Sequence, residues 1–203
     1  LVIAGLLSLA VVLGRLPGLS RLIDDPLFFK RCLVVHVDLA LVVWFCAFLA
    51  GLLALHAPGG TRGFRRAAFA TAVGGVIAML AGALMRGAQP ILSNYVPAID
   101  HPLFAAGLAA FAAGTLANFV HALLTPPSAG AAAPALAGLP QSAIIGFQAA
   151  AILLVVAGAT WVSARAGLPF GLDPATRAEF LTWGAGHVLQ AANTSAMLGV
   201  WLW

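Results

Sequence analysis

The side chains best able to do chemistry in this sequence are histidines that lie within or beside long apolar runs. Neutral imidazole is a good ligand for haem iron and for copper. Because an ionisable group in a membrane helix costs several kcal/mol to insert, each one is a functional candidate. We predict metal or haem ligation for the two that lie deeper in their runs, and an interfacial position near a helix end for the others. The deeper pair is His36 and His187, and the others are His56, His101 and His121.

The residues around His187 form one polar face of a predicted helix. At 100° per residue, Trp183 lies about −40°, Gln190 about −60° and Thr194 about −20° from His187 around the helix axis. A membrane helix with this face lines a bundle interior, a cofactor pocket or a water path. The alternative is hydrogen bonding between helices without a ligand, worth about 0.6 kcal/mol per bond.

Spacing along the run that holds His36 argues against one haem arrangement. A four-helix cytochrome b that stacks two haems needs histidines about 13 or 14 residues apart on one helix. His36 and His56 are 20 residues apart, which is about 30 Å, so they lie at opposite membrane surfaces.

Asp38 is the one acidic residue inside that run. It points about 200° away from His36 and cannot share its face. We consider three readings: a buried carboxylate paired with a neighbouring helix, a member of a proton path, or an acid solvated by lipid headgroups near the interface.

The composition places these side chains in a membrane protein. Hydrophobic residues make up 62% of the 203 residues and charged residues only 8%, and the mean hydropathy is +1.03. Because soluble domains are about half apolar and a quarter charged, these values exclude a soluble enzyme, a disordered chain and a nucleic-acid binder.

Cys32 and Cys46 are 14 residues apart on one run, which is about 21 Å along a helix and too far for a disulfide. We therefore expect both cysteines to act as small apolar side chains that fill space in the bundle.

Six apolar runs are long enough, or nearly so, to cross about 30 Å of hydrocarbon. None alternates apolar and polar residues as a barrel strand would, so the sequence predicts an all-α, polytopic transmembrane bundle forming a single domain over residues 1–203. The first run is short and the last stops at Trp203 without a polar tail, so we expect a piece of a longer protein, truncated at both ends. The predicted helices are 1–16, 32–56, 67–85, 102–124, 142–162 and 180–203.

Local signals add detail to these helices. Asp173 followed by Pro174 predicts an N-cap with proline in the first turn of the sixth helix. Small residues four apart predict close helix packing, at Ala47 with Gly51 and at Ala78 with Gly82.

The charges leave the orientation open. With the N-terminus inside, the cytoplasmic loops hold Arg62, Arg65 and Arg66, and the opposite loops hold the other seven of the ten Lys and Arg residues. The count by itself therefore favours the N-terminus outside.

Two stretches resemble a known family. The stretch from His36 through Val-Asp-Leu-Ala-Leu-Val-Val to Trp44 and Phe45 resembles the second helix of catalytic subunits in the haem–copper oxidase superfamily. The stretch Trp183-Gly-Ala-Gly-His187-Val-Leu-Gln190 resembles the sixth helix of the same subunits. The segment before the fourth helix, 93–97 through 100–102, is similar to divergent members often labelled cytochrome oxidase or nitric oxide reductase relatives.

The resemblance implies the first six helices of a twelve-helix core, with the N-terminus inside. It implies that His36 ligates a low-spin b haem, and that His187 is one of three ligands to a second metal, copper or non-haem iron, beside a high-spin haem. Trp183 and Gln190 would then be catalytic-site groups that orient the metal-bound histidine. Implied partners are the remaining half of the core or other membrane subunits, a cytochrome c or quinol electron donor and the lipid bilayer, with no nucleic acid, in the bacterial cytoplasmic membrane.

The substrate and the activity stay open at this point. Many oxygen reductases of the superfamily have a tyrosine, and common nitric oxide reductases a glutamate, where this chain has Ala191; O₂ and NO therefore both remain candidates. Two alternatives are a degenerate, non-catalytic relative in a larger redox complex and a six-helix transporter or channel.

Overall fold

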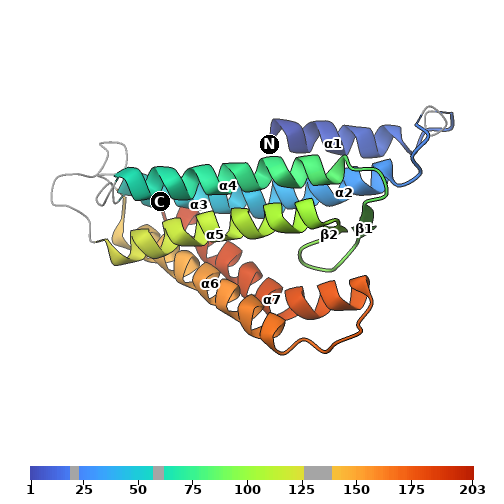
Figure 1. The fold of residues 1–203 in the computed structure, drawn as a ribbon. Coiled ribbons are helices and arrows are strands. Elements are labelled where there is room, and N and C mark those ends of the chain that lie inside the picture. The colour runs from blue at the N-terminus through green and yellow to red at the C-terminus, as the bar shows by residue number, and fades with distance from the viewer. Residues whose placement is uncertain (19–22, 57–61, 126–138) are drawn as a thin grey trace.

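A computed structural model describes residues 1–18, 23–56, 62–125 and 139–203 of the chain. The described chain is mostly helical, which confirms the predicted all-α bundle (Figure 1). In chain order the elements are α1 (Val2–Leu13), α2 (Phe28–Val37), the π-helical segment η2 (Asp38–Val43), α3 (Trp44–His56), α4 (Arg62–Ala83), β1 (Gln89–Ile91), β2 (Ala98–Asp100), α5 (Pro102–Leu124), α6 (Gln141–Ala166) and α7 (Pro174–Trp201).

Four of the described helices are long and apolar enough to cross a membrane. They are Phe28–Leu55, which joins α2, η2 and α3, and then α4, α5 and α6. Helix α1 has only 12 residues, and α7 has 28 residues but carries the polar face around His187. A membrane helix bundle is therefore supported, whereas crossing by the first and sixth predicted helices remains a prediction.

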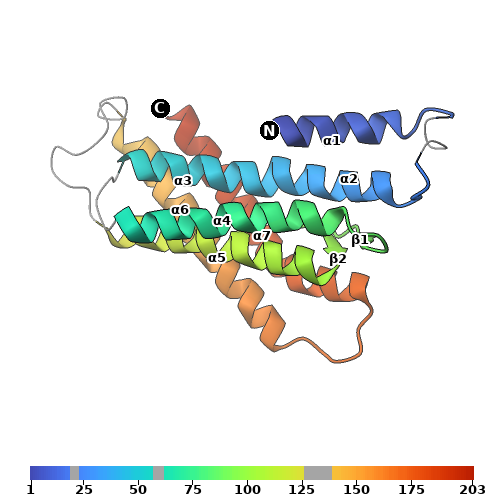
Figure 2. The ribbon, with the colours of Figure 1, turned by 45° about the horizontal axis from the view of Figure 1, so that its top comes forward.

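Helices neighbouring in sequence pack as antiparallel pairs. Figures 1 and 2 show α4 beside α5 and α6 beside α7, and α1 lies along α2. Glycine makes the α4–α5 approach possible: a Cβ added to Gly75 would lie 2.3 Å from the Phe111 nitrogen, and one added to Gly82 would lie 2.6 Å from the Phe104 nitrogen. The prediction of close packing at Gly82 is thus confirmed.

The same prediction is wrong for Ala47 and Gly51. Both are exposed, and a Cβ on Gly51 would meet no atom within 4 Å. The small side chains here leave open space instead of bringing two helices together.

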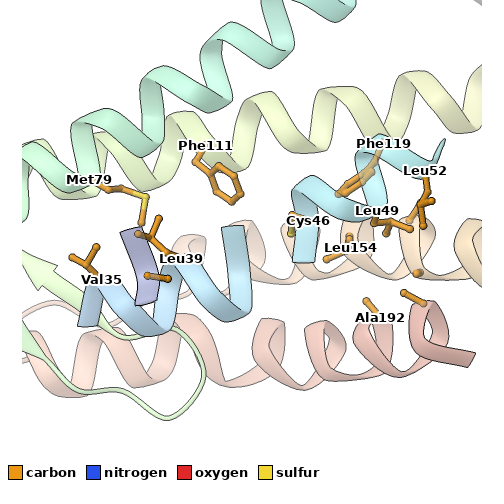
Figure 3. Close-up of a cluster of buried hydrophobic side chains, with 14 of the residues drawn as sticks. Val35, Leu39, Cys46, Leu49, Leu52, Met79, Phe111, Phe119, Leu154 and Ala192 are labelled. Carbon is orange, nitrogen blue, oxygen red and sulfur yellow. The ribbon is translucent and has the colours of Figure 1, made fainter. Parts of the chain in front are cut away.

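The buried core runs between the helix pairs. Leu49 and Leu52 of α3, Phe119 of α5, Leu154 of α6 and Ala192 of α7 belong to one buried cluster (Figure 3). At the other end of the cluster Val35 and Leu39 lie near Met79 of α4 in the same view. Helix α2 thereby packs on α4, whereas α7 packs mainly on α6.

Two short strands interrupt the helical pattern. Residues 89–91 pair antiparallel with 98–100, with Gln89 opposite Asp100. The sequence analysis predicts no strand here, because three residues are too few to show an alternating pattern. The hairpin carries the loop 92–97 that reaches α7.

Helix ends follow their capping groups more closely than their hydropathy. Helix α7 begins at Pro174, six residues before the predicted 180, because the Asp173 carboxylate accepts hydrogen bonds from the Ala175 and Thr176 N–H groups at 3.0 and 3.1 Å. These hydrogen bonds lower the pKa of the Asp173 carboxyl group, and those from Thr176 have the largest effect. The predicted N-cap is confirmed.

An ion pair anchors the start of α2. Arg31 is only 4% exposed; its guanidinium forms a salt bridge with Asp25 and donates to the Ala88 carbonyl at 3.3 Å. Helix α2 begins at Phe28, four residues before the predicted 32, so this cation lies within the helix. Hydrogen bonding to Arg31 holds the pKa of the Asp25 carboxyl below its usual value.

Candidate functional site

His187 lies on α7 with both ring nitrogens engaged. Its Nδ1 lies 2.8 Å from the Trp183 carbonyl oxygen one turn earlier, and its Nε2 lies 2.9 Å from the Tyr95 hydroxyl. A carbonyl only accepts, so Nδ1 carries the proton and donates it. Nε2 therefore holds the lone pair and accepts from the Tyr95 O–H.

Tyr95 reaches this position from the loop between β1 and β2. Its ring lies 4.8 Å from the His187 ring and 5.8 Å from that of Trp183, measured between centroids. The approach depends on Gly186, where an added Cβ would lie 2.2 Å from Tyr95 Cγ. A second link joins Asn94, through its amide and its backbone N–H, to the Glu179 carboxylate.

In the sequence, Tyr95 lies in the segment 93–97, which is similar to divergent haem–copper oxidase relatives, but the sequence analysis gives it no role. The residue is 92 positions from His187, so helical periodicity cannot connect them. The available signal was composition, since Tyr95 is the single tyrosine of the chain.

The predicted polar face of α7 exists, and it lies on the outside of the described chain. Trp183, His187, Gln190 and Thr194 are all exposed. The Thr194 hydroxyl donates to the Gln190 carbonyl at 3.0 Å, within the helix. The prediction that this face lines an interior is therefore not met by the part of the chain that the structure describes, and the interior would have to be completed by other protein.

His36 on α2 shows the same arrangement at its Nδ1. That atom lies 2.8 Å from the Ala4 carbonyl of α1, and the side chain is half-buried. The carbonyl accepts the Nδ1 proton, which leaves the lone pair on Nε2. Within the described ranges, Nε2 of His36 has no hydrogen-bond partner.

Two other histidines have structural contacts that suit the interfacial interpretation. His101 caps α5 by accepting from the Leu103 N–H at 3.2 Å. The His121 ring stacks on Phe64, with centroids 5.2 Å apart. His56 is the last residue of α3.

The structure does not bring His36 and His187 together. One is held by α1 and the other by the hairpin loop and its own helix, and no interaction joins the two rings within the described residues. Over the same residues, no three His, Cys, Asp or Glu side chains are grouped to hold a metal. A metal at either histidine would therefore need further donors from outside the described residues.

Asp38 is fully buried, with 0% of its surface exposed. Neither carboxylate oxygen has a hydrogen-bond partner among the described residues. Of the three interpretations, solvation by headgroups is wrong because the side chain is buried. Pairing with a neighbouring helix is not observed, because no partner hydrogen-bonds to the carboxylate among the described residues. The residue also begins η2, and π-helical segments occur often at functional sites.

Comparison with known proteins finds a relative and no family. No family model matches the chain, and no solved structure matches it. An uncharacterized protein of Aquifex aeolicus (strain VF5) is 31% identical over 205 residues, covering 98% of this chain and 49% of that protein. The chain thus spans about half the length of the curated relative it matches.

Replacing Tyr95 by phenylalanine tests the loop contact. The variant keeps the ring over Gly186 and loses the hydroxyl, so we expect a loss of about 0.5–1.5 kcal/mol in unfolding free energy and faster amide exchange in residues 92–97. Exchange measured by mass spectrometry on the purified protein checks this. Leu92→Ala, which shortens a side chain that is 63% exposed in the same loop, serves as the control; equal exchange in both variants would contradict the contact.

Proposed function

We propose that this chain is the first half of a haem–copper-type reductase core, in which His36 ligates a low-spin b haem and His187 ligates a second metal. The supporting observation is shared by the two histidines: each gives its Nδ1 proton to a backbone carbonyl and keeps its lone pair on Nε2. Metal-binding histidines usually have this second hydrogen bond, which fixes tautomer and ring orientation. His101, whose Nδ1 accepts a hydrogen bond, lacks the arrangement.

The positions of the two histidines along their helices support the proposal. Helices α2, α5 and α7 start at the hairpin end of the molecule and run the same way (Figure 1). His36 is 8 residues past the α2 start at Phe28, and His187 is 13 past the α7 start at Pro174. At 1.5 Å per residue these are about 12 and 20 Å along their helices, counted from the same end of the bundle.

The donor chemistry also fits the groups. Imidazole nitrogen suits haem iron, copper and non-haem iron. A metal at His187 requires the Tyr95 hydroxyl to leave Nε2, because that nitrogen has one lone pair. When bound, the high-spin haem and second metal would supply the electron-transfer chemistry that reduces O₂ or NO.

The chain's own residues then have defined tasks. The Trp183 carbonyl holds the His187 ring in one tautomer, and the Trp183 ring lies 5.1 Å away, between centroids. Gln190 is an exposed amide on the same helical face, available to a water or ligand between this chain and its partner. In this proposal the other half of the core covers the exposed face of α7 and supplies the missing ligands, electrons arrive from a cytochrome c or a quinol, and the complex lies in the bacterial cytoplasmic membrane.

Redox difference spectra with metal analysis on the full-length protein in its membrane test this function. We expect His36→Ala to abolish the low-spin haem signal, and His187→Ala to keep that signal while losing the second metal and the reductase activity. His101→Ala and His121→Ala are the matched controls and should keep both centres. Unchanged haem spectra in His36→Ala would rule the assignment out, and a wild-type complex without haem, copper or iron would favour the non-catalytic relative.

A further inference from the structure

A second candidate site lies away from the histidines, in a groove between α3, α4 and α5. Its volume is about 530 Å³. Its walls are mostly small or apolar, including Ala47, Ala50 and Gly51 of α3 and Val73 of α4. The groove opens on the surface of the described chain, since Ala47 and Gly51 are exposed and Phe69 at its side is 67% exposed.

The groove has the length of one lipid leaflet. It extends from Val43 at the end of η2 to Ala54 of α3, and along α4 from Arg62 to Val76. At 1.5 Å per residue these stretches measure about 16 and 21 Å. Half of the hydrocarbon core is about 15 Å thick, so an acyl chain that enters from one interface fits the groove.

One end of the groove is strongly basic. Arg62, Arg65 and Arg66 line it in the first turns of α4. Arg65 reaches across to the Ala54 carbonyl of α3 at 3.4 Å, which places its guanidinium between the two helices. Arg62 and Arg66 are exposed and pair with no acid among the described residues.

We propose that this groove binds an anionic phospholipid, with an acyl chain along Ala47, Gly51 and Val73 and the headgroup phosphate on Arg62 and Arg66. Charge complementarity selects this occupant: basic pockets between membrane helices at the interface bind anionic headgroups, and guanidinium groups match phosphate geometry. An uncharged quinol would make no use of the arginine charges, and free phosphate would make no contact with the apolar walls.

The glycines of the chain provide a matched pair of variants. A Cβ at Gly51 or at Gly74 would meet nothing within 4 Å, so the backbone at both positions accepts a Cβ without a clash. Gly51 lines the groove and Gly74 does not. We therefore expect Gly51→Leu to fill the groove and Gly74→Leu to leave it free.

The arginines allow a second matched pair. The double variant Arg62→Ala/Arg66→Ala removes two charges from the groove, and Arg86→Ala/Arg165→Ala removes two exposed charges outside it. One cation near a lipid surface strengthens the binding of an anionic lipid about fivefold. We therefore expect roughly 25-fold weaker retention of anionic lipid in the first variant. The second variant should retain nearly as much lipid as wild type.

The measurement is lipid retained by full-length protein, counted by native mass spectrometry after reconstitution with equal phosphatidylglycerol and phosphatidylcholine. The proposal predicts bound phosphatidylglycerol in wild type and Gly74→Leu, and its loss in Gly51→Leu and in Arg62→Ala/Arg66→Ala. Equal retention of both lipids, retention of a quinol in the double arginine variant, or phosphate binding that survives Gly51→Leu would overturn it. If Gly51→Leu misfolds, the arginine pair decides, and unchanged retention of phosphatidylglycerol in Arg62→Ala/Arg66→Ala would overturn the proposal.

Discussion

Replacing Gly75 by alanine is expected to separate the α4–α5 pair at the centre of the bundle. The added Cβ would lie 2.3 Å from the Phe111 nitrogen and 2.6 Å from the Gly107 carbonyl oxygen. These are backbone atoms, so no rotamer change relieves the clash and the helices must move apart. Overpacking of this kind costs about 1–3 kcal/mol, and we expect the upper end of that range because helix α5 must move as a unit.

The adjacent residue is the control. A methyl group on Gly74 would meet nothing within 4 Å, so Gly74→Ala should leave the unfolding free energy within about 0.5 kcal/mol of wild type. Unfolding by a denaturing detergent in mixed micelles, followed by circular dichroism, compares the two. Equal midpoints for Gly75→Ala and Gly74→Ala would show that the α4–α5 crossing is not as close as described.

Neutralising Asp25 is expected to destabilise the start of α2 and to change how stability depends on pH. Asp25 is the salt-bridge partner of Arg31, which is 4% exposed, and a buried cation without its partner is strongly unfavourable. The pKa of Asp25 is lowered in the folded protein, chiefly by its hydrogen bond to Arg31. The stabilisation is therefore complete above the unfolded-state pKa, about 3.9, and is lost as pH falls through the folded-state value.

Thermal unfolding from pH 7 down to pH 3 measures this effect. Wild type should lose stability below about pH 4, whereas Asp25→Asn should already be less stable at pH 7 and lose less on acidification. Asp24→Asn is the control, because Asp24 is the exposed neighbour and forms no described salt bridge. A parallel pH dependence in wild type and Asp25→Asn would contradict the role of the pair.

Features encoded locally could be predicted from the sequence. The apolar runs gave the helices, and the cap at Asp173 was found because an N-cap and its N–H donors lie within three residues. The common face of Trp183, His187 and Gln190 follows from helical geometry alone, and all three are exposed in the structure.

Features that depend on distant contacts could not be predicted. Tyr95 meets His187 across 92 positions through a hairpin too short to show a pattern. Ala47 and Gly51 illustrate a second limit: small residues permit close packing but do not require it, and here they line a groove. The exposed α7 face illustrates a third limit, because helical periodicity shows which residues share a face but not which neighbour covers it.

The hydrogen bonds of the two histidines imply an order of events during biogenesis. The His36 ring is held by Ala4 in the preceding helix, and the His187 ring by Trp183 one turn earlier. Both carbonyls come from segments synthesised before the histidine, so each imidazole acquires its tautomer as its own helix is inserted. The Tyr95 contact also joins His187 to an earlier segment, but it spans 92 residues and forms only when the hairpin loop packs against α7. We therefore expect nascent chains to fix the His187 tautomer within α7 first and to engage the hairpin loop afterwards.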